Sequence, residues 1–289
     1  MTETVKAYAK INLHLDITGI RDDGFHSVET VMQTVSLCDN VSVTLNGTKD
    51  ISCECDIQGV PTDEKNIAVR AARLYLSTAH IERGAHIKIE KRIPMAAGLA
   101  GGSADAAATL LALNRLCGSK LTTEELCALG STLGADVPFC IEGGCAYSDG
   151  KGDILHPFPQ IPKDTIFLVA FGGEGVSTPW GYGVMDKIYN NFADYAPKGT
   201  EKLRAVLLCQ HPEDFSKHLF NIFEEPILAQ RPVAAKIKMI MLDTEAKAAM
   251  MSGSGPSVYG VFESVAHAEK AMEIIQNNGY FAQVCYPAK

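Results

Sequence analysis

The chain has 289 residues, of which 46% are hydrophobic and 21% charged, and its formal net charge is −8. This length suffices for one large domain or two ordinary ones, each with a sizeable core. An acidic chain without a long basic run is not expected to bind nucleic acid, whereas a small phosphorylated ligand needs only a helix end and a few donors.

Membrane insertion and disulfide bonding are not expected either. The N-terminus lacks the charge pattern of a signal peptide, and no apolar run approaches the roughly 20 residues that cross a bilayer. The nine cysteines are scattered without a C-x-x-C pair, which predicts reduced thiols and a cytoplasmic protein. Cys53 and Cys55 share one face of an expected strand, but a metal site there is disfavoured because no partners with zinc spacing follow.

The first half of the chain predicts strands followed by helices. Residues 1–60 alternate apolar and polar residues in runs that are broken by turn sequences at 21–26 and 45–50. A helix is expected over 66–80, a strand over 85–91 and an alanine-rich helix over 103–116. Thr122 and Glu125 have the spacing of a capping box for a further helix, which ends at Leu133 before Gly134.

The second half differs in character. It predicts a buried strand over 165–171, a glycine-rich turn region over 172–183, helices over 200–247, a strand over 256–262 and a helix that ends at Gly279. A domain boundary is expected near 155–165, which divides the chain into residues 1–160 and 161–289. The fold class is α+β, with two lobes.

The segment IPMAAGLAGGSADAAATLLALN (93–114) contains a glycine-rich loop between a predicted strand and a predicted helix. Gly98, Gly101 and Gly102 allow a close approach of the backbone to an anion, and a helix that begins at Ser103 presents its positive end. The Walker pattern is absent because no lysine follows Gly102, and the G-x-G-x-x-G dinucleotide pattern does not fit. Alone, the loop is compatible with a phosphate site or with a close-packing turn.

Three other segments carry candidate chemistry. In AYAKINLHLDI (7–17) the alternation places a polar strip on one face, and the pattern alone favours a solvated strand face over the lining of a cleft. That strip consists of Tyr8, Lys10, Asn12, His14 and Asp16. In TLGADVPFC (132–140), Asp136 could form a turn with its own backbone, accept a proton or hold a metal. The small-residue loop at the start of MSGSGPSVYGVF (251–262) could be a tight hairpin-like connection.

Together these motifs resemble those of the GHMP small-molecule kinases. The motifs are AKINL at 9–13, P-x-x-x-G-L-x-G-G-S at 94–103, GADVP at 134–138 and SGSGP at 252–256. The resemblance covers essentially the full chain, and it is strongest to members that act on a cytidine diphosphate-linked methylerythritol in non-mevalonate isoprenoid synthesis. It implies a kinase that uses ATP and Mg²⁺, with a ribosomal-S5-like N-terminal lobe, a ferredoxin-like C-terminal lobe and a cleft between them.

The resemblance also implies roles for residues on the ATP side. Asp136 would accept the proton of the 2-hydroxyl group of the methylerythritol substrate, with Lys10 beside it as the cation. Ser103 is a candidate Mg²⁺ ligand. Asn66 and Lys91 would flank the adenosine. The ATP phosphates would lie on the loop formed by Pro94, Met95, Ala96, Ala97, Gly98, Leu99, Ala100, Gly101, Gly102, Ser103 and Ala104. Ala104 is a departure, because relatives often carry serine there, and modestly weaker ATP binding is expected.

On the substrate side, the resemblance implies contacts from Asn12, Phe25, His26 and Tyr182. Phe25 and His26 match an aromatic–histidine pair that reads cytosine, although phenylalanine lacks the phenol; the alternative for His26 is a surface histidine that caps a turn. Tyr182 is the candidate for a second stacking ring. The alternatives for the whole chain are a kinase of mevalonate, homoserine or a sugar, and a catalytically silent binding protein, which would be expected to lack Lys10 or Asp136. A monomer or weak homodimer is expected.

Overall fold

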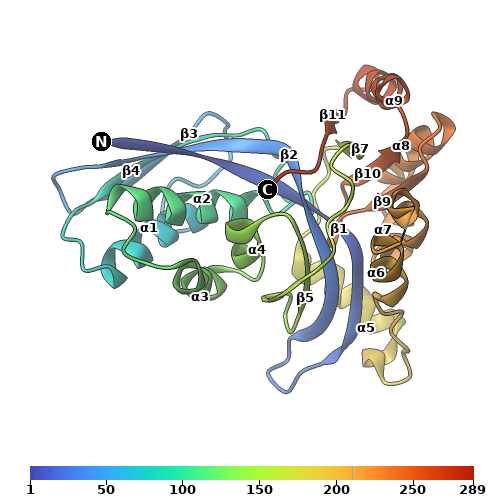
Figure 1. Ribbon diagram of the computed structural model, residues 1–289, viewed down its shortest axis with the longest axis horizontal. Helices are drawn as coiled ribbons and strands as arrows, with labels where there is room; N and C mark the ends of the chain where they lie inside the picture. Colours follow the sequence, from blue (N-terminus) through green and yellow to red (C-terminus); the bar gives the residue numbers. More distant parts are fainter. Residues whose placement is uncertain (210) are drawn as a thin grey trace. The chain divides into compact units, whose positions relative to one another are not determined.

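The protein is described here from a computed structural model, which covers residues 1–209 and 211–289. It forms two compact units, neither of which is continuous in sequence (Figure 1). Unit 1 comprises Met1–Ala9, Leu37–Met95 and Ala100–Gly143, and unit 2 comprises Lys10–Ser36, Ala96–Leu99 and Gly144–Lys289. These units differ from the expected division into 1–160 and 161–289, which stays a prediction about the family's two lobes.

The chain begins with three strands, as the alternation predicts. They are β1 (Thr2–Ile20), β2 (His26–Leu45) and β3 (Ile51–Cys55), separated by the two expected turns. With β4 (Ala85–Glu90) and β8 (Phe220–Asn221) they form a sheet of order β3-β4-β2-β1-β8. The strand β5 (Cys145–Asp149) pairs with β2, and β6 (Ile154–Pro157) pairs with β5.

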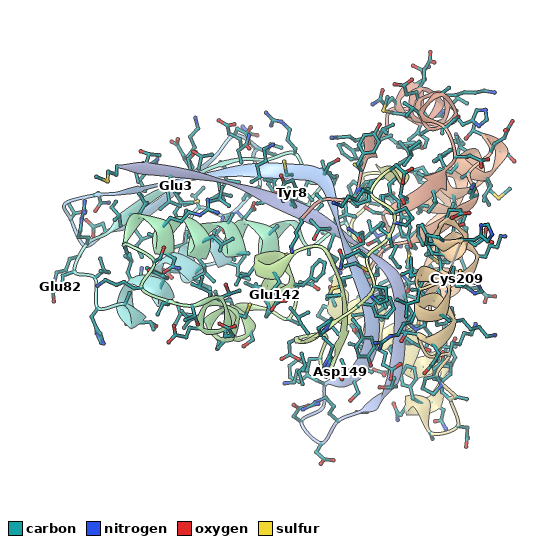
Figure 2. The ribbon with its side chains drawn as sticks, viewed as in Figure 1. Glu3, Tyr8, Glu82, Glu142, Asp149 and Cys209 are labelled. Atoms are coloured by element: carbon teal, nitrogen blue, oxygen red, sulfur yellow. The ribbon has the colours of Figure 1, made fainter. Side chains whose placement is uncertain are left out.

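Unit 1 places helices against β3 and β4. The helices are α1 (Ile67–Thr78), α2 (Gly101–Leu116), α3 (Thr123–Leu133) and α4 (Val137–Glu142), and α1 and α2 lie side by side (Figure 1). The capping box of Thr122 and Glu125 is present, which confirms the predicted start of α3. The alanines of α2 are buried, so neighbouring elements pack closely against it. At the last turn of α2, Arg115 pairs with Glu3, and Figure 2 labels Glu3 on β1.

Unit 2 contains a second, antiparallel sheet of order β11-β7-β10-β9. Its strands are β7 (Ile166–Phe171), β9 (Ala248–Met251), β10 (Val258–Phe262) and β11 (Phe281–Cys285). The helices α8 (Pro232–Asp243) and α9 (Val265–Asn277) pack on this sheet, and the four strands share a core with them. The succession β7-α8-β9-β10-α9-β11 has the split βαβ topology of ferredoxin-like folds.

The predicted turn region 172–183 is wrong from Thr178 onward, because α5 (Thr178–Ile188) begins there with Pro179 in its first turn. A side chain at Gly181 would meet Phe223 and Ser254, so this glycine marks close helix packing. The predicted elements do not include the strands β5, β6, β8, β9 and β11 or the helix α4. Three helices besides α8 lie in the described part of the range 200–247, which is predicted to be largely helical. They are α6 (Glu201–Leu207), η2 (Pro212–His218) and α7 (Glu224–Leu228). The short η1 (Asn190–Phe192) precedes that range. No helix in the described ranges is long and apolar enough to cross a membrane.

Candidate active site

The glycine-rich loop before α2 has an alternating backbone. Ala96, Gly98 and Ala100 have positive φ angles of 51°, 77° and 56°, whereas the residues between them do not. Such alternation forms the concave backbone arrangement called a nest, which binds anions through successive N–H groups. Helix α2 begins directly afterwards, two residues earlier than predicted, and it has no side-chain cap at its first turn. The loop therefore combines a nest with a helix N-terminus.

The carbonyl groups of this loop are held by other parts of unit 2. Val176 N donates to Ala96 O and Ser257 N donates to Ala97 O, both at 3.2 Å. Ser252 Oγ donates to Gly98 O at 3.0 Å, and Lys10 N donates to Leu99 O at 3.2 Å. The loop 252–257 that supplies two of these donors connects the antiparallel strands β9 and β10, so the hairpin-like connection is confirmed.

The N–H groups of the glycine-rich loop differ from its carbonyl groups in their hydrogen bonding. In the described part of the chain, no N–H group of residues 96–103 donates to a protein acceptor. Buried or half-buried N–H groups are nearly always paired, so a row of unpaired donors indicates an acceptor that the protein itself does not supply. Ala104 N, in contrast, donates to Ala100 O at 2.9 Å, and Ala104 is only 1% exposed. The row of donors therefore ends at Ser103, and Ala104 belongs to the packed helix.

The ammonium group of Lys91 is bound to two carboxylates of unit 1, and the place of this residue beside adenosine stays a prediction. Lys91 Nζ donates to Asp39 Oδ2 at 2.5 Å and to Asp105 Oδ2 at 2.6 Å, and all three side chains are at most 4% exposed. Burial disfavours the lysine charge, but the two carboxylates outweigh burial and raise the pKa of Lys91. A side chain at Gly101 would approach Lys91 Nζ to 3.2 Å, so the ion cluster lies directly beneath the start of α2.

The two carboxyl groups of this cluster are not equivalent. Asp39 also accepts from the backbone N–H groups of Arg92 and Ile93. Asp105 Oδ1 is buried and has no hydrogen-bond partner among the described residues. Burial is the largest effect on the pKa of Asp105. Together with the Asp39 carboxylate it raises this pKa to about 7, despite the opposing effect of Lys91. Asp105 is therefore the carboxyl group of this cluster that binds a proton as pH falls to about 7, because one lysine cannot neutralise two buried carboxylates.

Asn66 has a structural role that its predicted place beside adenosine did not include. Its Oδ1 accepts from Ala68 N at 2.9 Å as the N-cap of α1, and its Nδ2 donates to Pro61 O at 2.6 Å. Both side-chain atoms are thus used within unit 1, and Asn66 is 7% exposed. The residue fixes the entry of α1.

Asp136 lies at the N-terminus of α4, immediately before Val137 and Pro138. Its side chain does not cap that helix and is half-buried. In the same unit, a side chain at Gly134 would lie 3.8 Å from Ser103 Oγ. The start of α2 and the GADVP segment are therefore neighbours within unit 1.

The polar face of β1 is buried, which contradicts the interpretation of this strip as a solvated strand face. Lys10 is 5% exposed, and its Nζ donates to Asn12 Oδ1 at 2.9 Å. Asn12 Nδ2 in turn donates to Thr30 Oγ1 at 2.8 Å, and Thr30 Oγ1 donates to His14 O at 2.7 Å. Burying a charged and an amide side chain is costly unless they are paired, so this chain of bonds fixes the position of the Lys10 ammonium group.

Farther along the same face, two ionisable groups are perturbed by burial. Burial lowers the pKa of His14 to about 4, and His14 Nε2 has no partner within the described ranges. Burial also raises the pKa of Asp16, although this carboxyl group accepts from Tyr195 OH at 2.7 Å and from Lys198 N at 2.8 Å. His14 is therefore a neutral imidazole near neutral pH.

The structure brings two predicted substrate residues together in unit 2. The His26 and Tyr182 rings have centroids 4.6 Å apart, and His26 Nε2 lies 2.6 Å from Asp186 Oδ1. The interpretation of His26 as a turn-capping surface residue is therefore wrong. Phe25 is 58% exposed at the β1–β2 turn, and Lys151 Nζ lies over one face of its ring, 4.0 Å from the centroid.

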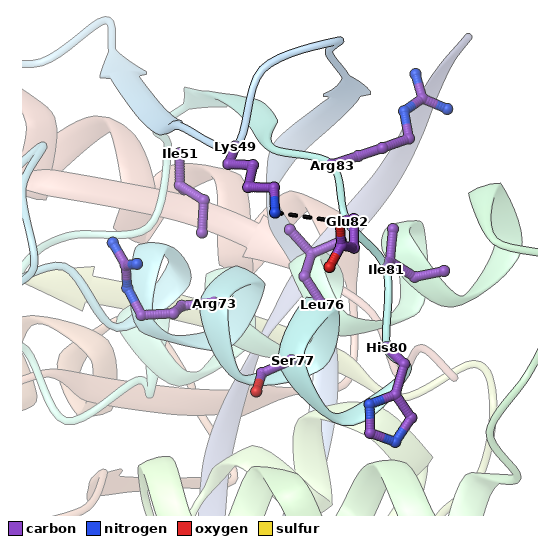
Figure 3. A pocket seen from close by; sticks show the side chains of 9 residues that line it. All are labelled: Lys49, Ile51, Arg73, Leu76, Ser77, His80, Ile81, Glu82 and Arg83. Atoms are coloured by element: carbon purple, nitrogen blue, oxygen red, sulfur yellow. Dashed lines mark hydrogen bonds and ion pairs between the residues drawn. The ribbon is translucent and has the colours of Figure 1, made fainter.

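No cluster of metal-ligating side chains marks the site among the described residues. No group of three or more His, Cys, Asp or Glu side chains there could hold a metal ion, Cys53 and Cys55 included. A surface pocket of about 340 Å³ in unit 1 is lined by none of the predicted site residues (Figure 3). Its Lys49–Glu82 ion pair is largely exposed and contributes little stability. The candidate site thus rests on the loop donors and the buried side chains around them.

Comparison with known proteins agrees with this geometry. Residues 66–144 match the model of the GHMP kinase N-terminal domain, and residues 202–280 match that of the C-terminal domain. A 4-diphosphocytidyl-2-C-methyl-D-erythritol kinase of Gloeobacter violaceus is 38% identical over 274 residues, which is 95% of this chain and 90% of the relative. The chain belongs to the GHMP kinase family. A kinase of the same name from Alkaliphilus oremlandii is 39% identical over 93% of this chain and 91% of its own length.

Solved structures of GHMP kinases share the fold. A 4-(cytidine 5′-diphospho)-2C-methyl-D-erythritol kinase superposes with a TM-score of 0.80 at 32% identity, covering 99% of this chain and 100% of that one. The mevalonate kinase of Methanococcus jannaschii superposes with a TM-score of 0.75 over 100% and 99% of the two chains, but at 14% identity it is informative about the fold alone.

Three polar residues at or beside the site were not anticipated from the sequence. Asp39, Asp105 and Asp186 are each bonded to a residue that had been predicted to bind a ligand. One signal was present for Asp105, a charged residue on the alanine-rich face of a predicted helix, because such a residue is almost never buried without a partner.

Proposed function

We propose that this GHMP kinase transfers the γ-phosphate of ATP to the 2-hydroxyl group of 4-diphosphocytidyl-2-C-methyl-D-erythritol, giving the 2-phosphate and ADP for non-mevalonate isoprenoid synthesis. The observation that carries the phosphate half of the proposal is the row of unpaired N–H donors over residues 96–103, which begins in a nest and ends at a helix N-terminus. The full-length similarity to kinases of that name supports the choice of acceptor.

Backbone donors suit phosphoryl transfer because this reaction depends on positioning and charge stabilisation more than on covalent chemistry. Loop carbonyls held by Lys10 N, Ser252, Ser257 and Val176 keep the donors in one geometry before ATP arrives. Such preorganised dipoles stabilise developing charge without reorganisation. A lysine within the loop is therefore not required.

The acceptor hydroxyl is activated, in our proposal, by Asp136 and Lys10. Asp136 is the aspartate of the GADVP segment, which lies beside the start of α2 within unit 1, and its carboxylate is a group that can accept a substrate proton. The Lys10 ammonium group is fixed by Asn12 and would favour an alkoxide-like oxygen. Because the transition state is loose, Asp136 acts mainly by orienting the hydroxyl group.

Mg²⁺ is part of the proposal. The site offers few side-chain oxygen ligands, with Ser103 Oγ at the start of α2 the candidate, and this suits an ion that is held mainly by substrate phosphates and water. When bound, Mg²⁺ neutralises charge on the β- and γ-phosphates.

The test is an assay of ADP formation with ATP, Mg²⁺ and each candidate acceptor in turn. We expect turnover with 4-diphosphocytidyl-2-C-methyl-D-erythritol, and none with mevalonate or homoserine, which carry no nucleobase. Turnover of mevalonate or homoserine in the absence of activity on the cytidylyl substrate would refute the proposal. No activity on any acceptor, with ATP binding retained, would favour a silent binding protein instead.

A further inference from the structure

His26 is held by a carboxylate from another element of unit 2. Its Nε2 lies 2.6 Å from Asp186 Oδ1, and the two side chains are 12% and 34% exposed. Asp186 lies on α5, four residues after Tyr182, so both residues project from the same face of that helix. Helix α5 thus contributes both an aromatic ring and a carboxylate to His26.

This contact determines which ring nitrogen of His26 carries hydrogen. An ionised carboxylate can only accept hydrogen bonds, so His26 Nε2 is the donor. In the neutral imidazole the other nitrogen, Nδ1, then has a lone pair and acts as an acceptor. Among the described residues, none donates to or accepts from His26 Nδ1, so this nitrogen is available to a ligand.

Two aromatic rings fix the plane of the imidazole. Tyr182 packs on it at 4.6 Å between centroids with an interplanar angle of 35°, and Phe192 meets it edge-on at 5.7 Å and 82°. Phe192 is itself stacked on Tyr189 at 5.4 Å. With one nitrogen bonded and the ring packed by two aromatic neighbours, the direction of the Nδ1 lone pair is set before a ligand binds.

We propose that Asp186 is a specificity-determining positioning residue, which holds His26 as a hydrogen-bond acceptor for the exocyclic amino group of cytosine. The inference rests on the proposed function, in which the acceptor substrate carries cytidine. Cytosine presents an amino donor where uracil presents a carbonyl oxygen, and that oxygen would face the Nδ1 lone pair. A buried polar group that loses its partner costs enough to give discrimination of roughly 10- to 100-fold between the two bases.

The central experiment compares cytidine- and uridine-diphosphate-linked methylerythritol as substrates of the wild type and of Asp186→Asn. An amide can donate or accept, so the side chain of this variant no longer dictates the tautomer of His26. We expect the wild type to prefer the cytidine substrate by about 10- to 100-fold in kcat/KM, and the variant to lose most of that preference through a raised KM for the cytidine substrate. KM for ATP should be unchanged, and Asp186→Glu should recover part of the preference.

A matched control is available in the same unit. Asp149, which is labelled in Figure 2, lies on the β5–β6 hairpin. Its Oδ2 is 3.1 Å from His156 Nε2, and the two side chains are 39% and 46% exposed. Asp149→Asn removes a similar carboxylate–histidine contact and should leave the base preference as it is in the wild type. An equal loss of preference in both variants would overturn the inference.

A readout that does not depend on turnover is the ¹⁵N spectrum of the His26 imidazole, assigned with His26→Gln. We expect a protonated Nε2 and an unprotonated Nδ1 in the wild type. Cytidine monophosphate, but not uridine monophosphate, should shift the ¹⁵N signal of Nδ1. In Asp186→Asn we expect a mixture of tautomers. If the wild type phosphorylates neither substrate, the proposed function fails, and these spectra alone decide the inference. A protonated Nδ1 in the wild type, or an unchanged base preference in Asp186→Asn, would overturn it.

Discussion

Replacing Asp105 with asparagine is expected to change how the free energy of unfolding depends on pH. Burial raises the pKa of Asp105 from 3.8 to about 7, so the folded protein retains a proton that the unfolded chain releases. A carboxyl group with a raised folded pKa contributes stability that is complete below the unfolded pKa and is lost as pH rises through the folded pKa. Asparagine resembles the protonated carboxyl group and does not titrate.

The magnitude follows from the size of the shift. The pKa of Asp105 rises from 3.8 to about 7, which is a change of about three pKa units. Each unit corresponds to about 1.4 kcal/mol, so the contribution of Asp105 to the free energy of unfolding decreases by about 4 kcal/mol in total as pH rises. About 3 kcal/mol of this loss falls between pH 5 and pH 8. Lys91 stays charged throughout, because its pKa is raised by the two carboxylates, so it adds no titration of its own in this window.

The measurement is urea denaturation of the wild type and Asp105→Asn at pH 5, 6, 7 and 8. The unfolding free energy of the variant, minus that of the wild type, should rise by about 3 kcal/mol across the series. Asp56→Asn is the control, since Asp56 forms an ion pair with Arg92 at the surface and its pKa is lowered, chiefly by the backbone N–H of Lys91. A difference that falls with pH would show that Asp105 is an ordinary ionised partner of Lys91, and would refute the reasoning.

Three further outcomes are expected. Asp136→Asn should lower kcat by roughly 10²- to 10⁴-fold with little change in ATP affinity, as measured by steady-state kinetics. The control is Asp243→Asn, a change of an exposed aspartate on α8. Retained activity in Asp136→Asn would rule out Asp136 as the base. Gly98→Ala should raise KM for ATP at least about tenfold and lower Tm. The reason is that Gly98 has φ 77° and a methyl group there would collide with Ser252 O. Unchanged kinetics would contradict the proposed loop geometry. Burial lowers the pKa of His14 from 6.5 to about 4, so the free energy of unfolding of the wild type should fall by about 3 kcal/mol as pH falls through this interval. In acid denaturation, His14→Gln should lack this pH-dependent loss. Equal dependence of the unfolding free energy on pH in the two proteins would contradict the prediction.

The sequence alone was sufficient to locate most elements and the glycine-rich loop before α2. Hydrophobic alternation located β1 to β4, the capping box located the start of α3, and the glycine loop before an alanine-rich helix indicated an anion site. These features depend on local rules, namely side-chain periodicity, end capping and the conformational range of glycine, so a single segment contains the information. The motif order then identified the family.

The tertiary structure decided which polar residues are paired and which are available. The polar strip of β1 alternates as a solvated strand would, but its second face is covered, so Lys10 and Asn12 are buried and bonded to each other. Lys91 is predicted to flank adenosine, and only the structure shows that its ammonium group pairs with Asp39 and Asp105, which are 52 and 14 positions away in the chain. Burial and pairing depend on segments that are distant in sequence, and the pKa values and tautomers that govern the chemistry depend on them in turn.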